Sequence, residues 1–230
     1  MPPETPPKIL EVSGLSKGYN IDGQALMAVN NVSMSALSGE MISIVGHSGS
    51  GKTTLLSLMG GLTRPDKGTV AVDGTDIWML SDDDRSELRN RRISFIYQFS
   101  SLVPTLTALE NVLLPMAFGH APSGAGDRAA ELLRLVGLGD KRRAYPAQLS
   151  GGQQRRVAIA RAFVMGPEIV LADEPTGDLD EETEKEIMNL FTRMNSEEAV
   201  TFVIVTHDRQ IAAMASRRFG MTNGVLSPMG

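Results

Sequence analysis

The 230-residue sequence contains no cysteine, one tryptophan and three histidines, and aromatic residues make up only 5% of it. Without cysteine the chain has no disulfide, no thiolate zinc or iron–sulfur site and no cysteine nucleophile. Long apolar runs are also missing. A membrane-spanning helix needs about 20 apolar residues, whereas Pro115 interrupts the run 112–118 and the run 200–205 has the length of a strand. The sequence therefore predicts no membrane-spanning helix.

A basic excess is lacking as well, since 22 Lys and Arg stand against 27 Asp and Glu and give a net charge of −5. Proteins that bind nucleic acid by neutralising phosphates usually have such an excess, so no nucleic-acid partner is expected. Residues 1–7 are rich in proline and contain no apolar stretch, which predicts a disordered tail and not a signal peptide. The expected location is the cytoplasm.

Short apolar segments alternate with helical ones along the rest of the chain. Residues 8–12 and 29–34 predict an antiparallel edge, with turns at Gly23 and at Asn30–Asn31. Further strands are expected at 41–45, 69–72, 93–97, 169–172 and 200–205. Helices are expected at 52–59, 82–90, 153–165 and 181–195. Strands that alternate with helices indicate an α/β fold with a mostly parallel, doubly wound sheet.

The segment 98–153 has a different character. Apolar residues recur at helical spacing in 109–117 and 129–136, and a loop rich in Pro, Gly and Ser lies between them at 121–126. This pattern predicts an inserted helical subdomain. The helix after it is expected to place Ala, Val and Ile on one side. The other side is expected to hold three arginines, namely Arg155, Arg156 and Arg161.

Residues 46–53 read Gly-His-Ser-Gly-Ser-Gly-Lys-Thr and fit the phosphate-loop pattern G-x-x-x-x-G-K-[ST]. A predicted strand precedes the motif and a predicted helix follows it, so backbone N–H groups and the helix N-terminus can surround phosphate oxygens. Lys52 can reach the β- and γ-phosphates, and the Thr53 hydroxyl can bind Mg²⁺. The residues expected to bind ATP here are Gly46, His47, Ser48, Gly49, Ser50, Gly51, Lys52, Thr53 and Thr54.

Two acidic residues, Asp173 and Glu174, follow the apolar segment 169–172 directly. At the carboxyl end of a parallel strand, Asp173 would face a metal ion beside the phosphate loop, and a carboxylate oxygen suits Mg²⁺. Glu174, one residue further, is placed to orient and polarise an attacking water. These two residues are the candidate metal ligand and the candidate general base.

Residues 149–153, just before the predicted helix 153–165, read Leu-Ser-Gly-Gly-Gln. A serine and two glycines at a helix N-terminus form a second place for phosphate oxygens. The pentapeptide resembles the signature of the ABC-type ATPases, which belong to the P-loop (RecA-like) NTPases, and the resemblance covers residues 8–225. The signature residues are Leu149, Ser150, Gly151, Gly152 and Gln153.

The resemblance implies one ABC ATPase domain at 8–230, in which residues 8–97 and 154–230 form the core and residues 98–153 form the helical subdomain. In this family two subunits pair head-to-tail, so each signature closes on the ATP of the partner. A homodimer in the ATP-bound state is therefore expected, with ATP and Mg²⁺ as the ligands.

Four further residues match the family's pattern in order along the chain. Tyr19 resembles the aromatic residue that stacks on adenine, although a core tyrosine at a strand end would look the same. Gln98 resembles the glutamine that binds Mg²⁺ and couples to the membrane partner. Asp180 resembles the acidic residue of the loop that crosses the dimer interface, and it also fits a helix N-cap. His207 resembles the histidine that contacts the γ-phosphate, and the catalytic set implied is Lys52, Gln98, Glu174 and His207.

The motifs at 95–99 and 102–112 resemble a subgroup, the lipoprotein-release and macrolide-export ATPases of the LolD and MacB types. Differences from the subgroup pattern occur at His47, Asp178, Ser100–Ser101 and Tyr145. The resemblance implies an ATPase that drives a separate integral membrane permease and lies at the cytoplasmic face of the membrane through it. Two alternatives stay open: a cell-division-type ATPase that signals without transport, and an ABC ATPase of import or of DNA or ribosome function.

Overall fold

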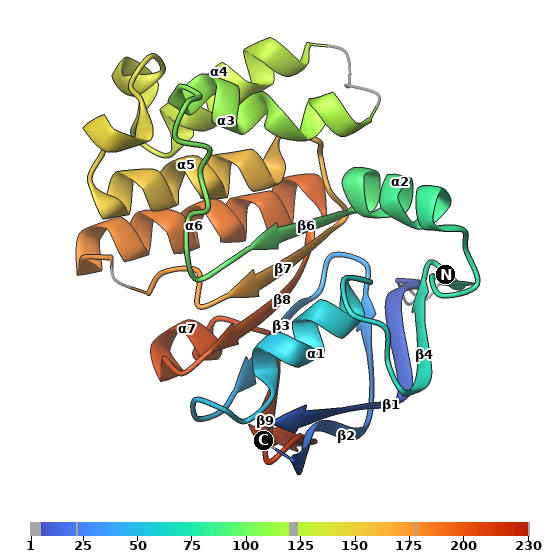
Figure 1. The fold of residues 1–230 in the computed structure, drawn as a ribbon. Helices are drawn as coiled ribbons and strands as arrows, with labels where there is room; N and C mark the ends of the chain where they lie inside the picture. The colour runs from blue at the N-terminus through green and yellow to red at the C-terminus, as the bar shows by residue number, and fades with distance from the viewer. Residues whose placement is uncertain (1–5, 22, 120–123, 178, 230) are drawn as a thin grey trace, which may run out of the picture.

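The protein is described by a computed structural model, which covers residues 6–21, 23–119, 124–177 and 179–229. These residues form two β-sheets, with helices packed against them (Figure 1). The larger sheet has the strand order β10-β9-β3-β8-β7-β6 and the smaller one β2-β1-β4-β5. Parts of the expected tail 1–7 and of the expected loop 121–126, as well as Asp178, lie outside the described residues.

The larger sheet is parallel apart from one edge strand. Neighbouring strands pair in parallel from β9 through β3, β8 and β7 to β6, and β10 pairs antiparallel with β9. Most residues of the central strands are buried, as in sheets that are covered by other elements on both faces. The predicted parallel α/β sheet is confirmed. Its strands are β3 (Met41–Val45), β6 (Ile93–Ile96), β7 (Ile169–Asp173), β8 (Thr201–Thr206), β9 (Arg217–Thr222) and β10 (Val225–Met229).

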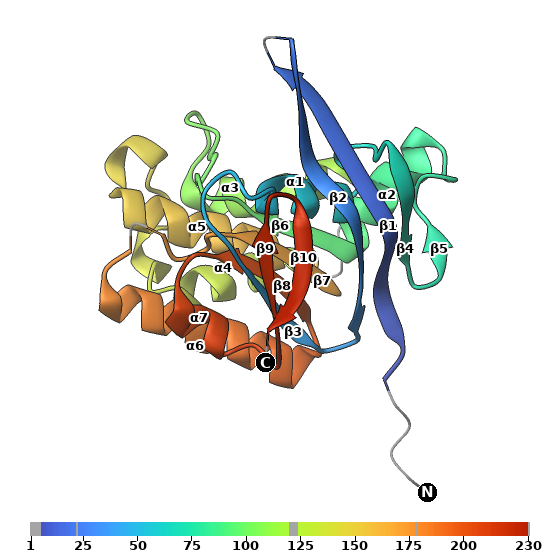
Figure 2. The same cartoon turned by 90° about the horizontal axis from the view of Figure 1, so that it is seen from below.

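The smaller sheet is antiparallel and extends well beyond the expected edge strands (Figure 2). The turn expected at Asn30–Asn31 is wrong, because both residues lie inside β2. Asn31 there has φ 50°, which asparagine tolerates better than most residues, and its N–H donates to Ser16 Oγ at 3.0 Å. The strands are β1 (Lys8–Ile21), β2 (Gln24–Leu37), β4 (Lys67–Val72) and β5 (Thr75–Asp76).

Helix α1 (Lys52–Met59) lies between the two sheets, and α5 (Gly151–Phe163) and α6 (Glu181–Glu198) cover the opposite face of the larger sheet (Figure 1). The helix expected at 109–117 ends at Leu113, because Pro115 removes a backbone donor and the chain continues as 3₁₀ helix. The remaining helices are α2 (Asp82–Arg92), α3 (Ala108–Leu113), α4 (Ala125–Leu135) and α7 (Arg209–Ala213). Short 3₁₀ turns occupy Leu114–Phe118, Gly139–Lys141 and Pro146–Gln148.

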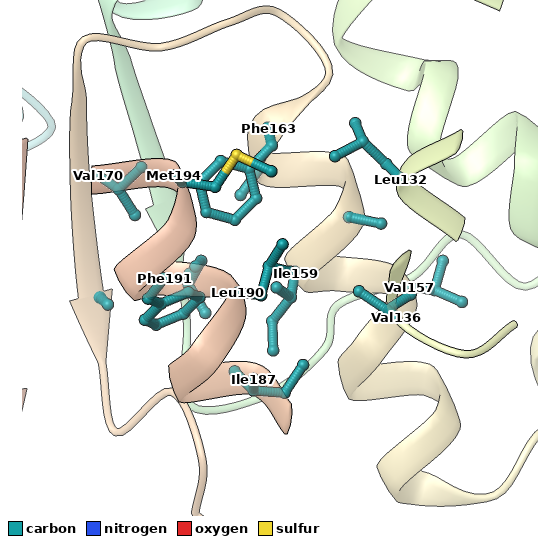
Figure 3. Close-up of a cluster of buried hydrophobic side chains, with 14 of the residues drawn as sticks. Leu132, Val136, Val157, Ile159, Phe163, Val170, Ile187, Leu190, Phe191 and Met194 are labelled. Carbon is teal, nitrogen blue, oxygen red and sulfur yellow. The ribbon is translucent and has the colours of Figure 1, made fainter. Parts of the chain in front are cut away.

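A cluster of buried side chains joins α5, α6 and the larger sheet (Figure 3). At its centre the rings of Phe191 and Phe202 stack at 5.0 Å between centroids, and Phe163 meets Phe191 edge-on at 6.0 Å. All three rings are fully buried. Burial of this kind is the main favourable contribution to folding, and it fixes α5 and α6 on the sheet. Among the described residues no helix is long and apolar enough to cross a membrane.

We expect Phe191→Ala to lower the free energy of unfolding by about 3–5 kcal/mol, because it removes a fully buried ring and leaves a cavity between α6 and β8. Urea denaturation measures the change. Met79→Ala is the control, since Met79 is 84% exposed and its loss should change the value by less than about 0.5 kcal/mol. Equal effects of the two substitutions would contradict this account of the core.

Candidate nucleotide-binding and catalytic site

The phosphate-loop motif lies where the sequence predicts it, between the end of β3 and the start of α1. Gly51 has φ 103°, and a Cβ there would lie 2.0 Å from the carbonyl oxygen of Ala28. A Cβ at Gly46 would lie 2.4 Å from the carbonyl oxygen of Met221. The loop therefore packs directly against neighbouring backbone, and only glycine fits at these two positions.

The β9–β10 hairpin supports this loop, and the sequence analysis missed it. The N–H of Gly224 in the hairpin turn donates to the carbonyl of Ser50 at 3.0 Å, and the carbonyl of Gly224 accepts from the N–H of Asn30 at 2.9 Å. Asn223 and Gly224 both have positive φ. An Asn-Gly pair between apolar segments is a strong hairpin signal, so the sequence did contain the information.

Lys52 and Thr53 begin α1 and point into the site. The Lys52 ammonium donates to the carbonyl oxygens of Gly46 at 2.6 Å and His47 at 3.1 Å. The Thr53 hydroxyl donates to Asp173 Oδ2 at 2.7 Å, so the ends of β3 and β7 meet here. Burial raises the pKa of the Asp173 carboxyl, while the hydrogen bond from Thr53 acts in the opposite direction.

Glu174 follows β7 in the left-handed region, at φ 46°. Its N–H donates to the carbonyl of Val205 at 2.9 Å, and its carboxylate accepts from the Thr206 hydroxyl at 3.0 Å. His207 Nδ1 lies 2.9 Å from Glu174 Oε1. The hydrogen bond and charge of Glu174 raise the pKa of His207. Because few non-glycine residues adopt such a φ, the backbone at this acid is strained, a feature that is enriched at functional sites.

These groups line one cleft of about 880 Å³. Tyr19 lies at its rim, where the Lys17 ammonium stands 5.7 Å from the ring centroid. Asp66 holds this end of β1, accepting from the N–H of Gly18 at 2.8 Å and from Lys17 Nζ at 2.7 Å. The predicted residues that line the cleft are Tyr19, His47, Ser48, Gly49, Ser50, Gly51, Lys52, Thr53, Thr54, Gln98, Asp173, Glu174 and His207.

The predicted signature residues are not part of the cleft lining. Ser150 is the N-cap of α5 and forms a capping box, in which its hydroxyl accepts from the N–H of Gln153 at 3.2 Å. Asp180 caps α6 in the same manner, accepting from the N–H of Thr183 at 2.9 Å. Both motifs therefore have a structural role in capping, and within one chain the structure does not bring the signature into the cleft.

The expectation that Arg155 lies on the side of its helix opposite the apolar residues is wrong. Its side chain is buried, with 4% exposed. The guanidinium donates to the carbonyl oxygens of Tyr97 and Gln98, and to that of Glu174 at 2.7 Å. An arginine in a helix that also carries Arg156 and Arg161 gives no local signal that it points inward.

The donor set fits a magnesium nucleotide. The Thr53 hydroxyl and the Asp173 carboxylate meet in the cleft, and Gln98 lines the same cleft, so the lining includes the hard oxygen atoms that Mg²⁺ prefers. The loop before α1 and the Lys52 ammonium offer positive charge to phosphate oxygens. The arrangement can therefore hold a triphosphate beside an acid and an imidazole, which is the layout of a phosphoryl-transfer site.

Comparison with known proteins agrees with this layout. The family model described as ABC transporter matches residues 29–177, which is more than half of the chain. The chain is 46% identical over 220 residues to the lipoprotein-releasing system ATP-binding protein LolD of Bordetella pertussis, covering 95% of each. It is also 40% identical over 223 residues to the macrolide export ATP-binding/permease protein MacB of Syntrophobacter fumaroxidans, covering 96% of this chain and 31% of that protein.

Among solved structures, the ATP-binding cassette MJ0796, determined as a dimer in a post-hydrolysis state bound to ADP and Pi, superposes with a TM-score of 0.89 at 39% identity. The superposition covers 96% of this chain and 99% of that one. Sequence, fold and site thus lead to the same assignment: the chain belongs to the ABC transporter family and is an ATPase, an ATP-binding subunit of the LolD and MacB type.

Proposed function

We propose that two copies of this chain pair head-to-tail around two MgATP and drive a separate membrane permease in export or lipoprotein extraction. The observation that carries the proposal is the cleft itself, in which Lys52, Thr53, Asp173, Glu174 and His207 converge from the ends of three adjacent parallel strands. Ligands of open α/β sheets bind at this carboxyl edge.

Each group in the cleft has a defined task. The loop N–H groups and Lys52 bind the phosphates, while Tyr19 stacks on the base. Thr53, Gln98 and Asp173 would hold Mg²⁺, which would supply positive charge beside the phosphates. Glu174 orients the attacking water and accepts its proton, and His207 contacts the γ-phosphate. Positioning and electrostatic stabilisation carry the rate, since phosphoryl transfer requires little covalent chemistry from the protein.

The pairing of two copies is supported by the position of the signature residues, which do not line the cleft of their own chain. Ser150, Gly151 and Gln153 lie at the N-terminus of α5, outside the cleft lining, and the first two are exposed. A second copy supplies these groups to the γ-phosphate. The relative MJ0796 was determined as a dimer. ATP then stabilises the closed pair more than the open one, and hydrolysis reverses that preference.

A permease partner is supported by the names of the relatives. One belongs to a lipoprotein-releasing system, and the other joins ATP-binding and permease functions in a protein of which this chain covers 31%. We place the docking surface beside the residues of 98–153 that form the helical subdomain, where Phe99 is 75% exposed next to Gln98. Through such a permease the chain lies at the cytoplasmic face of the membrane.

Glu174→Gln should abolish most turnover while preserving ATP binding. The amide keeps the shape of the side chain but cannot accept a proton, and general-base catalysis contributes about 10²–10⁴-fold. Phosphate release gives the rate, and size-exclusion chromatography with MgATP should show a trapped dimer. Glu186→Gln on the exposed side of α6 is the control and should hydrolyse ATP normally. Turnover of Glu174→Gln close to that of the parent would refute the assigned role.

The imidazole of His207 should titrate above its ordinary pKa in the nucleotide-free protein. The Glu174 carboxylate favours the protonated ring, so the pKa of His207 is higher in the folded protein than in the unfolded chain. The pair therefore stabilises the fold fully at pH values below the pKa of the unfolded chain, and this stabilisation is lost as the pH rises through the raised pKa of the folded protein. NMR titration measures the midpoint. In Glu174→Gln the midpoint should fall toward the ordinary value, and an unchanged midpoint would show that Glu174 does not cause the shift.

Purification of the chain from its native membrane in mild detergent should recover an integral membrane permease, identified by mass spectrometry. Phe99→Ala should lose the permease and retain ATP binding, because it removes exposed apolar surface outside the cleft. Met79→Ala is the control, because Met79 is also a highly exposed apolar residue, and it should retain both. Recovery of a division-type permease would favour signalling over transport, and recovery with ribosomes or DNA-repair proteins alone would exclude the transporter function.

A further inference from the structure

The buried guanidinium of Arg155 connects two segments that carry residues of the site to helix α5. It lies in the second turn of α5 and donates to the carbonyl oxygens of Tyr97, at 2.6 Å, and Gln98. It also donates to the carbonyl oxygens of Glu174 at 2.7 Å and Gly177 at 3.2 Å. The segment after β6 and the connection between β7 and α6 are therefore both held by one side chain of α5.

Only arginine has the shape for this task. Its planar guanidinium carries five N–H donors in a fixed fork, whereas lysine offers one compact ammonium. These four acceptors are backbone carbonyls, so Arg155 holds the path of the main chain beside the cleft. Two of these carbonyls belong to Gln98 and Glu174, whose side chains line the cleft.

Glu174 in particular needs such support. Its φ of 46° is unfavourable for a residue with a side chain and persists only when neighbouring contacts impose it. The carbonyl of Val205 accepts from its N–H, Thr206 and His207 contact its carboxylate, and its own carbonyl accepts from Arg155 and from the N–H of Gly177. Arg155 is the contact that ties this residue to helix α5.

A second arginine of α5 shows what Arg155 adds. Arg161 donates to the carbonyl oxygens of Ser100 at 2.9 Å and Ser101 at 3.0 Å, so α5 holds the segment after β6 at several carbonyls along its length. Figure 1 shows this segment passing α5 on its way to α3. These two hydrogen bonds of Arg161 stay within this segment, whereas Arg155 also reaches Glu174.

We propose that Arg155 is a positioning residue for ATP hydrolysis, which ties the backbone of Gln98 and Glu174 to helix α5. The helix begins at the Ser150 capping box, one turn before Arg155, so a contact at the signature that shifts α5 is transmitted to the general base. This inference rests on the proposed roles of Gln98 and Glu174, which the Glu174→Gln variant tests separately.

Steady-state hydrolysis by Arg155→Gln tests the proposal, with rates divided by the number of ATP-binding sites measured in the same preparation. We expect kcat to fall by about tenfold or more while KM and the ATP affinity change by less than about threefold, because the base is misplaced and the phosphate loop is intact. Arg155→Lys keeps the positive charge, but one ammonium cannot bridge the segment after β6 and the connection after β7 as the guanidinium does, so it should show the same loss of kcat.

Arg156→Gln is the matched control, since Arg156 is the next residue of α5 and donates to Val136, away from the cleft. It should lower kcat by less than about twofold, and thermal unfolding of all variants measures the cost in stability. A normal kcat per site in Arg155→Gln, an equal loss in Arg156→Gln, or a rise in KM alone would each overturn the proposal.

If Arg155→Gln does not fold, Arg155→Lys takes its place: a lowered kcat supports the proposal and a normal kcat overturns it. If Glu174→Gln keeps its turnover while Arg155→Gln loses it, the proposed base is wrong and the link to α5 stands through Gln98.

Discussion

Parallel hydrogen bonding between β3, β8 and β7 fixes where the groups of the cleft stand. Val45 at the end of β3 pairs with Thr206, and Asp173 at the end of β7 pairs with Val205. The phosphate loop, the acidic pair and His207 consequently leave the sheet at the same edge. A slip of one residue would reverse the buried face of a strand and separate Asp173 from Thr53. The register of three strands is therefore the constraint on which the chemistry depends.

That register is specified by burial on both faces of the sheet. One face receives the cluster of α5 and α6, with the rings of Phe163, Phe191 and Phe202 in contact, and the other face receives α1. The side chains of each strand point alternately into these two closely packed layers, so a strand shifted along its neighbours would not fit either layer. The same helix α1 that fills one layer carries Lys52 and Thr53 at its start, so packing and phosphate binding use one element.

The parts of the site that are formed by residues adjacent in the sequence could be predicted. The phosphate loop, the Asp173–Glu174 pair and the parallel strands were predictable, because each is a local pattern with one physical interpretation. Contacts between residues far apart in the sequence could not be predicted. Nothing near Arg155 indicates that its acceptors stand 19 and 57 residues away. The misplaced turn at Asn30–Asn31 has the same origin, since pairing with β1 overrides the local turn preference of asparagine.

The charged groups of the cleft are already satisfied by the protein. Lys52 donates to two carbonyls of its own loop, and Glu174 accepts from Thr206 and His207. A phosphate that approaches Lys52 exchanges these carbonyl oxygens for its own, so the gain is a difference between two hydrogen-bonded states and not the full energy of a new bond. The same holds for Glu174, whose carboxylate must exchange protein partners for the attacking water in the proposed mechanism. The contact that holds its backbone then bears on how accurately the carboxylate meets that water.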